Sequence, residues 1–261
     1  MNNVRRRWIS KHPARLRYWM LKLGIRSLLK FVSAESVEQF IRMLRESPSG
    51  AVFNPWWQMD NENDIGRKAP AIRRRQLRAY LQKRVGKANV AVIGEAVGYR
   101  GGHFTGIPMT SERLLLRRSK KVCLKSNDFF SDINPRRTSK PEKCPDGFSE
   151  PTATIVWDAL LRLDLKPDQF VLWNAFPWHS FDPRRGMLSN RMPKKSEQAA
   201  GLPVLNAFLE LFPCDQVFAL GKIAAAQLEE FNVNAHCIRH PASGGARLFR
   251  TQIAEIVNKG A

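Results

Sequence analysis

The segment Ala91-Val92-Ile93-Gly94-Glu95-Ala96-Val97-Gly98 constrains the fold of this chain more than any other. Its first residues are apolar and predict a buried strand of a parallel sheet. Glycines on both sides of Glu95 predict a tight turn that presents its carboxylate at the carboxyl edge of the sheet. Because ligands of open α/β sheets bind at that edge, Glu95 is a candidate base or water-activating group. The alternative is a solvated glutamate in a surface turn.

Three more apolar segments follow the first, and segments with helical periodicity separate them. We expect strands at about residues 89–95, 169–174, 215–220 and 234–239. We expect helices at about residues 67–87, 152–163, 196–212, 223–231 and 248–257. This alternation predicts a parallel sheet with helices on both of its faces.

The chain carries 43 lysines and arginines against 23 aspartates and glutamates, a formal net charge of +20. Such an excess favours binding to a polyanion, either nucleic acid or an anionic membrane surface. No segment reaches the roughly 18 consecutive apolar residues that a membrane-spanning helix needs. The basic N-terminus is not followed by the apolar stretch of a signal peptide, so we expect a soluble intracellular protein. The four cysteines form no C-x-x-C pair, and we expect no metal.

Residues 1–47 combine a strongly basic composition with a helical pattern. We expect a basic helical extension there, with a second short helix beginning near Ser36, and one α/β domain over residues 48–261. The extension is open to three interpretations: a nucleic-acid arm, a helix on a membrane surface, or a helix packed on the domain. Two further basic segments, 67–87 and 113–125, are predicted to contact DNA phosphates, and a solvated surface is the alternative.

Each predicted strand ends on a residue that is able to contact a ligand. The strand ends carry Glu95, Asn174, Gly221 and His240, and the loop over residues 101–106 adds Phe104. A carboxylate, an amide, an imidazole and an aromatic ring on a basic surface are the groups that chemistry on a flipped nucleobase needs. The structural alternatives are an Asn that caps a turn, a His bonded before a proline turn, and a Phe packed in its loop.

These segments resemble the motifs of the uracil-DNA glycosylase superfamily, in the same order, over about residues 50–257. Residues 94–98 resemble the water-activating Gly-Glu-Ala-Pro-Gly motif, with Val97 in place of its proline. Residues 104–106 resemble the segment with the stacking phenylalanine. Residues 173–177, with 190–197 downstream, resemble the strand that carries the base-binding asparagine, and residues 240–242 resemble the start of the minor-groove loop.

The resemblance implies a three-layer α/β/α sandwich with a central four-stranded parallel sheet. It implies that Glu95 positions the attacking water near C1′ and that His240 stabilises the departing base. The base-binding residues would be Phe104, Asn174, Gly98 and Tyr99, and the DNA-binding residues Thr110, Ser111, Arg191, Ser243, Gly244 and Arg247. For Thr110 and Ser111, capping of the following helix is the alternative. No cofactor is expected, and the cysteine spacing does not support the iron–sulphur cluster of one branch that shares the glutamate motif.

We therefore predict a monofunctional, monomeric DNA glycosylase that flips a pyrimidine out of DNA and hydrolyses its N-glycosidic bond. Uracil is the default base. Val97 and Gly98 favour an alternative, a C5-modified pyrimidine such as a bulky modified cytosine of phage DNA, whose excision would serve defence rather than repair. An alternative of another class is a catalytically silent DNA-binding module. The expected partner is DNA and not a membrane, and the expected location is the cytoplasm at the nucleoid of a bacterial or phage-associated system.

Overall fold

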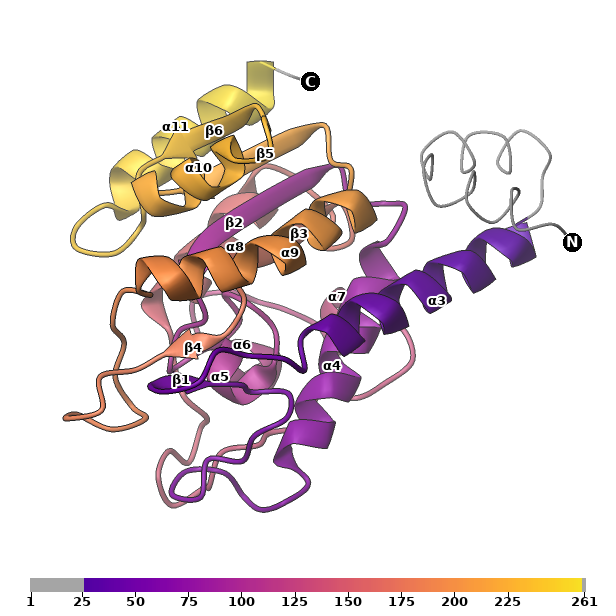
Figure 1. Cartoon of the computed structure of the whole chain (residues 1–261). Helices are drawn as coiled ribbons and strands as arrows, with labels where there is room; N and C mark the ends of the chain where they lie inside the picture. Colours follow the sequence, from indigo (N-terminus) through magenta and orange to yellow (C-terminus); the bar gives the residue numbers. More distant parts are fainter. Residues whose placement is uncertain (1–25, 260–261) are drawn as a thin grey trace, which may run out of the picture.

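The computed structural model describes residues 26–259 (Figure 1), and its centre is a sheet of four strands. These strands are β2 (Val90–Ala96), β3 (Phe170–Phe176), β5 (Gln216–Leu220) and β6 (Ala235–Ile238). All four are parallel, and their spatial order is β3-β2-β5-β6. The carboxyl ends of the strands therefore meet at one edge, and the register places Gly94 opposite Asn174.

Helices cover both faces of this sheet, which gives the three-layer α/β/α architecture (Figure 1). One face is covered by α9 (Lys195–Leu211) and α10 (Lys222–Glu229). The other face is covered by α8 (Pro151–Arg162) and α11 (Ala246–Lys259). Near the β3 edge, α3 (Arg26–Met43) packs against both α4 (Ala69–Arg84) and α9. The fold predicted from the sequence is confirmed.

Aromatic side chains of β3 join the sheet to both helical layers. On the α9 side, the Trp173 ring stacks on Phe208 with 5.1 Å between centroids and an interplanar angle of 8°. On the α8 side, Phe170 meets Trp157 edge-on at 5.1 Å. All seven residues of β3 are buried, which explains why this strand is a continuous apolar segment in the sequence.

The remaining elements lie in the connections. Residues 97–169 contain three short helices, α5 (Gly102–Thr105), α6 (Glu112–Leu115) and α7 (Ser126–Phe129). A small antiparallel pair joins β1 (Val52–Phe53) to β4 (His179–Ser180). The polar segment 117–150 contains α7, where Phe129 and the following Phe130 are buried.

The basic extension also differs from the prediction. Instead of a second short helix near Ser36, one helix, α3, runs from Arg26 to Met43. Its Phe40 packs edge-on against Trp173 in the core of the domain, at 5.0 Å between centroids. The predicted helix before Arg26 lies outside the described residues, and the boundary at residues 47/48 stays a prediction. Within residues 26–259, no helix is both long and apolar enough to cross a bilayer.

Candidate active site

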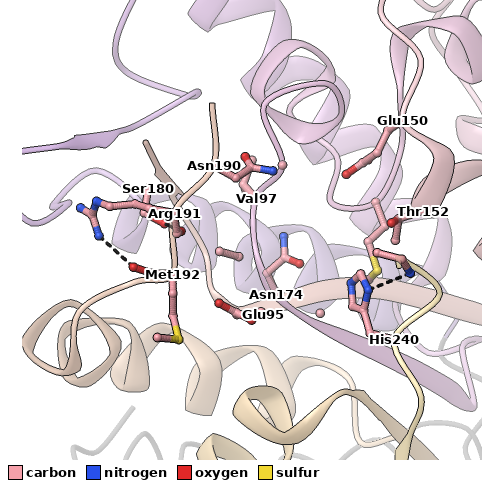
Figure 2. A pocket seen from close by; sticks show the side chains of 15 residues that line it. Glu95, Val97, Glu150, Thr152, Asn174, Ser180, Asn190, Arg191, Met192 and His240 are labelled. Carbon is pink, nitrogen blue, oxygen red and sulfur yellow. Dashed lines mark hydrogen bonds between the residues drawn. The ribbon is translucent and has the colours of Figure 1, made fainter. Parts of the chain in front are cut away.

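A cavity of about 360 Å³ opens at the carboxyl edge of the sheet (Figure 2). Binding sites for small molecules have volumes of roughly 300–1,000 Å³, so the cavity is large enough to hold a flat heterocycle. It is lined by Gly94, Glu95, Ala96, Val97, Gly98, Met109, Glu150, Thr152, Asn174, Ser180, Asn190, Arg191, Met192, His240 and Ala242. The sheet edge thus brings together the three strand-end side chains Glu95, Asn174 and His240, as the sequence predicts.

Glu95 is the penultimate residue of β2 and lines the cavity (Figure 2). Its side chain is partly exposed, and partial burial raises the pKa of its carboxyl group above the ordinary value. A carboxylate with a raised pKa is a stronger base than one in bulk water. The geometry therefore suits Glu95 to accept a proton from water inside the cavity.

Asn174 faces Gly94 across the β2–β3 pair. A Cβ atom on residue 94 would lie 2.6 Å from the Asn174 Oδ1 atom, so only glycine leaves room for the amide. Asn174 is 1% exposed, and neither Oδ1 nor Nδ2 has a hydrogen-bond partner among the described residues. Buried polar groups are rarely left unpaired because each costs about 1–3 kcal/mol, so this amide is arranged for a ligand.

His240 follows β6 and lines the cavity (Figure 2). Its Nδ1 atom accepts a hydrogen bond from the backbone N–H of Ala242 at 3.1 Å, which leaves Nε2 to carry the proton. Burial, together with the charge of Arg239, lowers the pKa of His240 below its ordinary value. The imidazole is therefore neutral at physiological pH and acts as a hydrogen-bond donor through Nε2.

Glu150 is a cavity residue that the sequence analysis missed. It occupies the position before α8, but its side chain makes no capping hydrogen bond to that helix. Its carboxyl group packs instead against the backbone of Gly98 and Gly101, where any Cβ atom would collide with it. Burial raises the pKa of Glu150 to about 7. In the sequence, Glu150 stands directly before a helix that begins at Pro151. Nothing in that pattern distinguishes it from an ordinary surface glutamate.

The loop after β4 closes one side of the cavity and is fixed by Arg191. The guanidinium group binds both oxygens of Glu197, at 2.7 Å each, and donates to the carbonyls of Phe181, Ala51 and Met192. All five of its N–H groups are thus engaged within the protein. Arg191 therefore positions the loop, and the prediction of a contact to DNA is corrected.

A row of buried, hydrogen-bonded side chains also holds the loop after β4 in place. His103 Nδ1 lies 3.0 Å from His179 Nδ1, and His103 Nε2 lies 3.1 Å from an oxygen of Asp60. His179 Nε2 in turn lies 2.8 Å from the Ser189 carbonyl oxygen. Burial lowers the pKa of His179 to about 3, so this chain is a structural support rather than a proton store.

Several predicted site residues do not reach the cavity. Phe104 is fully buried in α5 and stacks on Phe148 at 4.4 Å, so its ring has no free face for a base. Tyr99 does not line the cavity either, and its backbone N–H donates to Asn190 Oδ1 at 3.0 Å. Of the predicted base-binding residues, Asn174 and Gly98 line the cavity.

Thr110 and Ser111 have structural roles, which corrects their assignment to phosphate binding. Both are fully buried. The Thr110 hydroxyl accepts from the Trp157 indole N–H at 3.1 Å and donates to the Pro108 carbonyl at 3.2 Å. Ser111 caps α6 through the backbone N–H of Leu114. The capping interpretation therefore holds for Ser111, and Thr110 instead bonds to the core.

The turn after His240 begins at Ala242, which lines the cavity. Ser243, Gly244 and Arg247 follow it and are exposed, and their contact with DNA stays a prediction. Ser243 and Gly244 both have a positive φ, 51° and 76°, which makes the turn tight. Two large apolar side chains in this part of the molecule are exposed: Met192, which lines the cavity, at 63%, and Leu248, in α11, at 51%.

The basic segment 67–87 is less available to DNA than its composition suggests. Arg84 is fully buried and donates to the carbonyls of Phe170, Tyr80, Phe129 and Asp128. Arg73 is fully buried in an ion pair with Asp64, with 2.6 Å between Nη1 and Oδ1. In the segment 113–125, by contrast, Arg117, Arg118, Lys120 and Lys121 are exposed.

The fold and the cavity together define an α/β enzyme whose site suits a small, flat, polar ligand such as a nucleobase. The family model described as the uracil DNA glycosylase superfamily matches residues 83–256, and the chain belongs to this superfamily. The protein is accordingly a DNA N-glycosylase.

One similar solved structure is wild-type SMUG2 from Pedobacter heparinus, with a TM-score of 0.56. The match covers 87% of this chain and 97% of that one at 14% sequence identity, so it supports the fold alone. No curated protein matches the sequence.

Proposed function

We propose that this DNA glycosylase flips a pyrimidine into the cavity and hydrolyses its N-glycosidic bond, leaving the strand intact. The observation that carries this proposal is the unpaired Asn174 amide, 1% exposed at the sheet edge. An amide offers one acceptor and two donors, which match the neighbouring donor and acceptor positions on a pyrimidine edge. A bound base would satisfy the polar atoms that the protein leaves unpaired.

The bond is broken by water that Glu95 positions at C1′ of the flipped nucleotide. As the C1′–N1 bond lengthens, its electron pair leaves with the base and positive charge develops on the sugar. The water oxygen bonds to C1′ and its proton passes to the Glu95 carboxylate. The Nε2–H of His240 donates to the base as negative charge builds on it, which stabilises the departing anion.

The lining of the cavity supports a monofunctional enzyme. A lyase step requires an amine that forms a Schiff base with the sugar, and none of the residues that line this cavity is a lysine. The product of this route is a free base and an abasic site in an unbroken strand.

Uracil is the base that the cavity favours. Gly98 leaves space that would admit a C5 substituent, but the carboxyl group of Glu150 occupies that space. A bulky modified cytosine would have to displace the Glu150 carboxyl group, so the defence alternative receives no support from this geometry. That the enzyme acts as a monomer in the cytoplasm, at the nucleoid, stays a prediction.

The test is base release from single- and double-stranded oligonucleotides that carry one uracil, cytosine, thymine or 5-hydroxymethyl pyrimidine. We expect the purified protein to release uracil, detected by mass spectrometry, and to leave a site that breaks only on alkaline treatment. Strand breakage without alkali would contradict the monofunctional route. Release of no base from any substrate would contradict the proposed reaction.

A further inference from the structure

The Glu150 carboxyl group makes no hydrogen bond or ion pair among the described residues. It forms no capping bond to α8, and its Oε2 atom is buried without a hydrogen-bond partner among the described residues. Space for it exists only because residues 98 and 101 are glycines. A buried carboxyl oxygen without a partner is costly unless something binds to it. The group faces the cavity, so its partner is to be sought in the ligand.

The place of Glu150 in the cavity indicates which part of a base it would meet. In Figure 2, Asn174 lies between Glu95 and Glu150. The sugar of a bound nucleotide must lie near Glu95, because water held there attacks C1′. The base then extends past Asn174, and its edge remote from the sugar points to Glu150.

A pyrimidine offers one more hydrogen bond at that remote edge than Asn174 is able to satisfy. The two polar atoms of the amide pair with N3 and with the nearer side of the group at position 4. That group has a second site on its C5 side: a second lone pair in a 4-oxo base, or a second hydrogen in a 4-amino base. Glu150 is the polar side chain placed to meet this second site.

Asn174 alone does not distinguish the two kinds of base. Since no hydrogen bond among the described residues fixes its amide, rotation by half a turn exchanges Oδ1 and Nδ2. One orientation matches a 4-oxo base and the other matches a 4-amino base. The choice therefore depends on the second polar group.

We propose that Glu150 is a specificity-determining residue that selects the group at position 4 of the flipped pyrimidine through its own protonation state. As a neutral acid, it donates its O–H to a 4-oxo group, as in uracil. As a carboxylate, it accepts from a 4-amino group, as in cytosine, and repels a 4-oxo group. This inference rests on the proposed function, since it places a pyrimidine in the cavity.

Both forms of Glu150 are accessible near neutral pH, because burial raises the pKa of its carboxyl group to about 7. Burial is the cause of this shift, with no contribution from a neighbouring charge. The titratable and charged residues that line the cavity with Glu150 are Glu95, Arg191 and His240. Tyr99 and Arg100 lie between the two glycines that its carboxyl group contacts. Arg191 is already paired with Glu197, and burial lowers the pKa of His240 below its ordinary value.

The test measures binding without chemistry. Single-stranded oligonucleotides carry one 2′-fluoroarabino uridine, cytidine or adenosine, because the electron-withdrawing fluorine prevents loss of the base. Dissociation constants are measured at about pH 6 and about pH 8, one unit on either side of the Glu150 pKa of about 7. Neither free pyrimidine titrates in this interval.

For the wild type, we expect the preference for uridine over cytidine to fall by at least about tenfold between the two pH values. In Glu150→Gln, whose amide both donates and accepts, the preference should not change with pH. Glu142→Gln is the matched control, because Glu142 is an exposed glutamate outside the cavity. It should behave as the wild type.

A wild-type preference that does not change with pH overturns the proposal, whether or not the Glu150→Gln variant folds. An equal change in the wild type and in folded Glu150→Gln also overturns it. Failure of the proposed function has a different signature: neither pyrimidine oligonucleotide would bind more tightly than the one with adenosine.

Discussion

At the scale of single residues, Asn174 and Glu150 place polar atoms without hydrogen-bond partners in the cavity, where a ligand is able to bind them. Asn174 Oδ1, Asn174 Nδ2 and Glu150 Oε2 are all buried, and none of them has a hydrogen-bond partner among the described residues. Folding does not benefit from such groups, since a buried unpaired donor or acceptor costs about 1–3 kcal/mol. Removing them should therefore separate activity from stability.

Replacing Asn174 with alanine tests this separation directly. We expect kcat/KM for uracil release to fall by about tenfold or more, because the amide contacts to the base are lost. The free energy of unfolding should stay the same or rise by about 1 kcal/mol, because two unpaired polar atoms leave the interior. Urea denaturation and single-turnover kinetics measure the two quantities. A loss of stability beyond about 1 kcal/mol would show that Asn174 is structural instead.

Glu150 makes the stability of the protein depend on pH. Its pKa is raised from 4.5 to about 7, so the folded protein holds this proton where the unfolded chain has lost it. Ionisation of Glu150 therefore costs no stability below about pH 4.5, and the protein becomes less stable as the pH rises from there to about 7.

Glu150→Gln removes this titration. We expect the variant to gain roughly 1–3 kcal/mol over the wild type between about pH 5 and about pH 8. Denaturant unfolding at the two pH values measures the gain. A difference between the two proteins that is the same at both pH values would mean that Glu150 ionises as it does in water.

At the scale of secondary-structure elements, the sequence predicts the sheet well because its strands are long buried apolar segments. All seven residues of β3 are buried, and the helices between the strands have a helical repeat. The four-residue helices α5, α6 and α7 are too short for any periodicity to show. Their positions are set by packing in the β2–β3 connection, which local patterns do not encode.

The candidate site likewise contains residues that the sequence predicts and residues that it does not. Glu95, Asn174 and His240 were predictable because the carboxyl ends of parallel strands must meet at one edge. Glu150, Asn190 and Met192 reach the cavity from loops, and only tertiary packing decides where a loop residue lies. For Phe104 the prediction failed in the other direction. Its segment resembles the expected motif, but its ring stacks on Phe148 and does not reach the cavity.

The loop after β4 carries a prediction about base flipping. Met192 lines the cavity and is 63% exposed, while the ion pair of Arg191 with Glu197 holds its backbone. An apolar side chain at the rim is able to fill the space that a flipped nucleotide leaves in a duplex. We expect Met192→Ala to slow excision from double-stranded DNA by about tenfold and to leave excision from single strands nearly unchanged.

Leu248→Ala is the matched comparison, because Leu248 is also exposed at 51% but lies on α11. If only Leu248→Ala shows the loss specific to duplex DNA, the residue that enters the stack comes from the segment after β6 and the account of Met192 is wrong.

At the scale of the whole molecule, the net charge of +20 predicts how the protein finds DNA. Phosphate contacts release counterions, so the logarithm of the affinity should fall linearly with the logarithm of the salt concentration, by about 0.9 per phosphate neutralised. Arg247 is exposed in the first turn of α11, seven residues after His240. We expect Arg247→Ala to reduce the slope by about one unit on any DNA sequence.

Arg162→Ala is the control for charge alone. Arg162 is exposed at the end of α8 opposite to Glu150, and it pairs with Asp158 at 2.7 Å. Its replacement should leave the salt slope unchanged. If the two variants lower the slope equally, the DNA does not lie across the cavity mouth.

The most direct test of the whole account is the single-turnover rate of uracil release by Glu95→Gln, which keeps the shape of the side chain and removes its base. We predict a rate roughly 10²–10⁴-fold below that of the wild type, with the affinity for DNA unchanged. Glu142→Gln, an exposed glutamate outside the cavity, should retain the wild-type rate. A Glu95→Gln variant that releases uracil at the wild-type rate would contradict the central claim that this carboxylate activates the water.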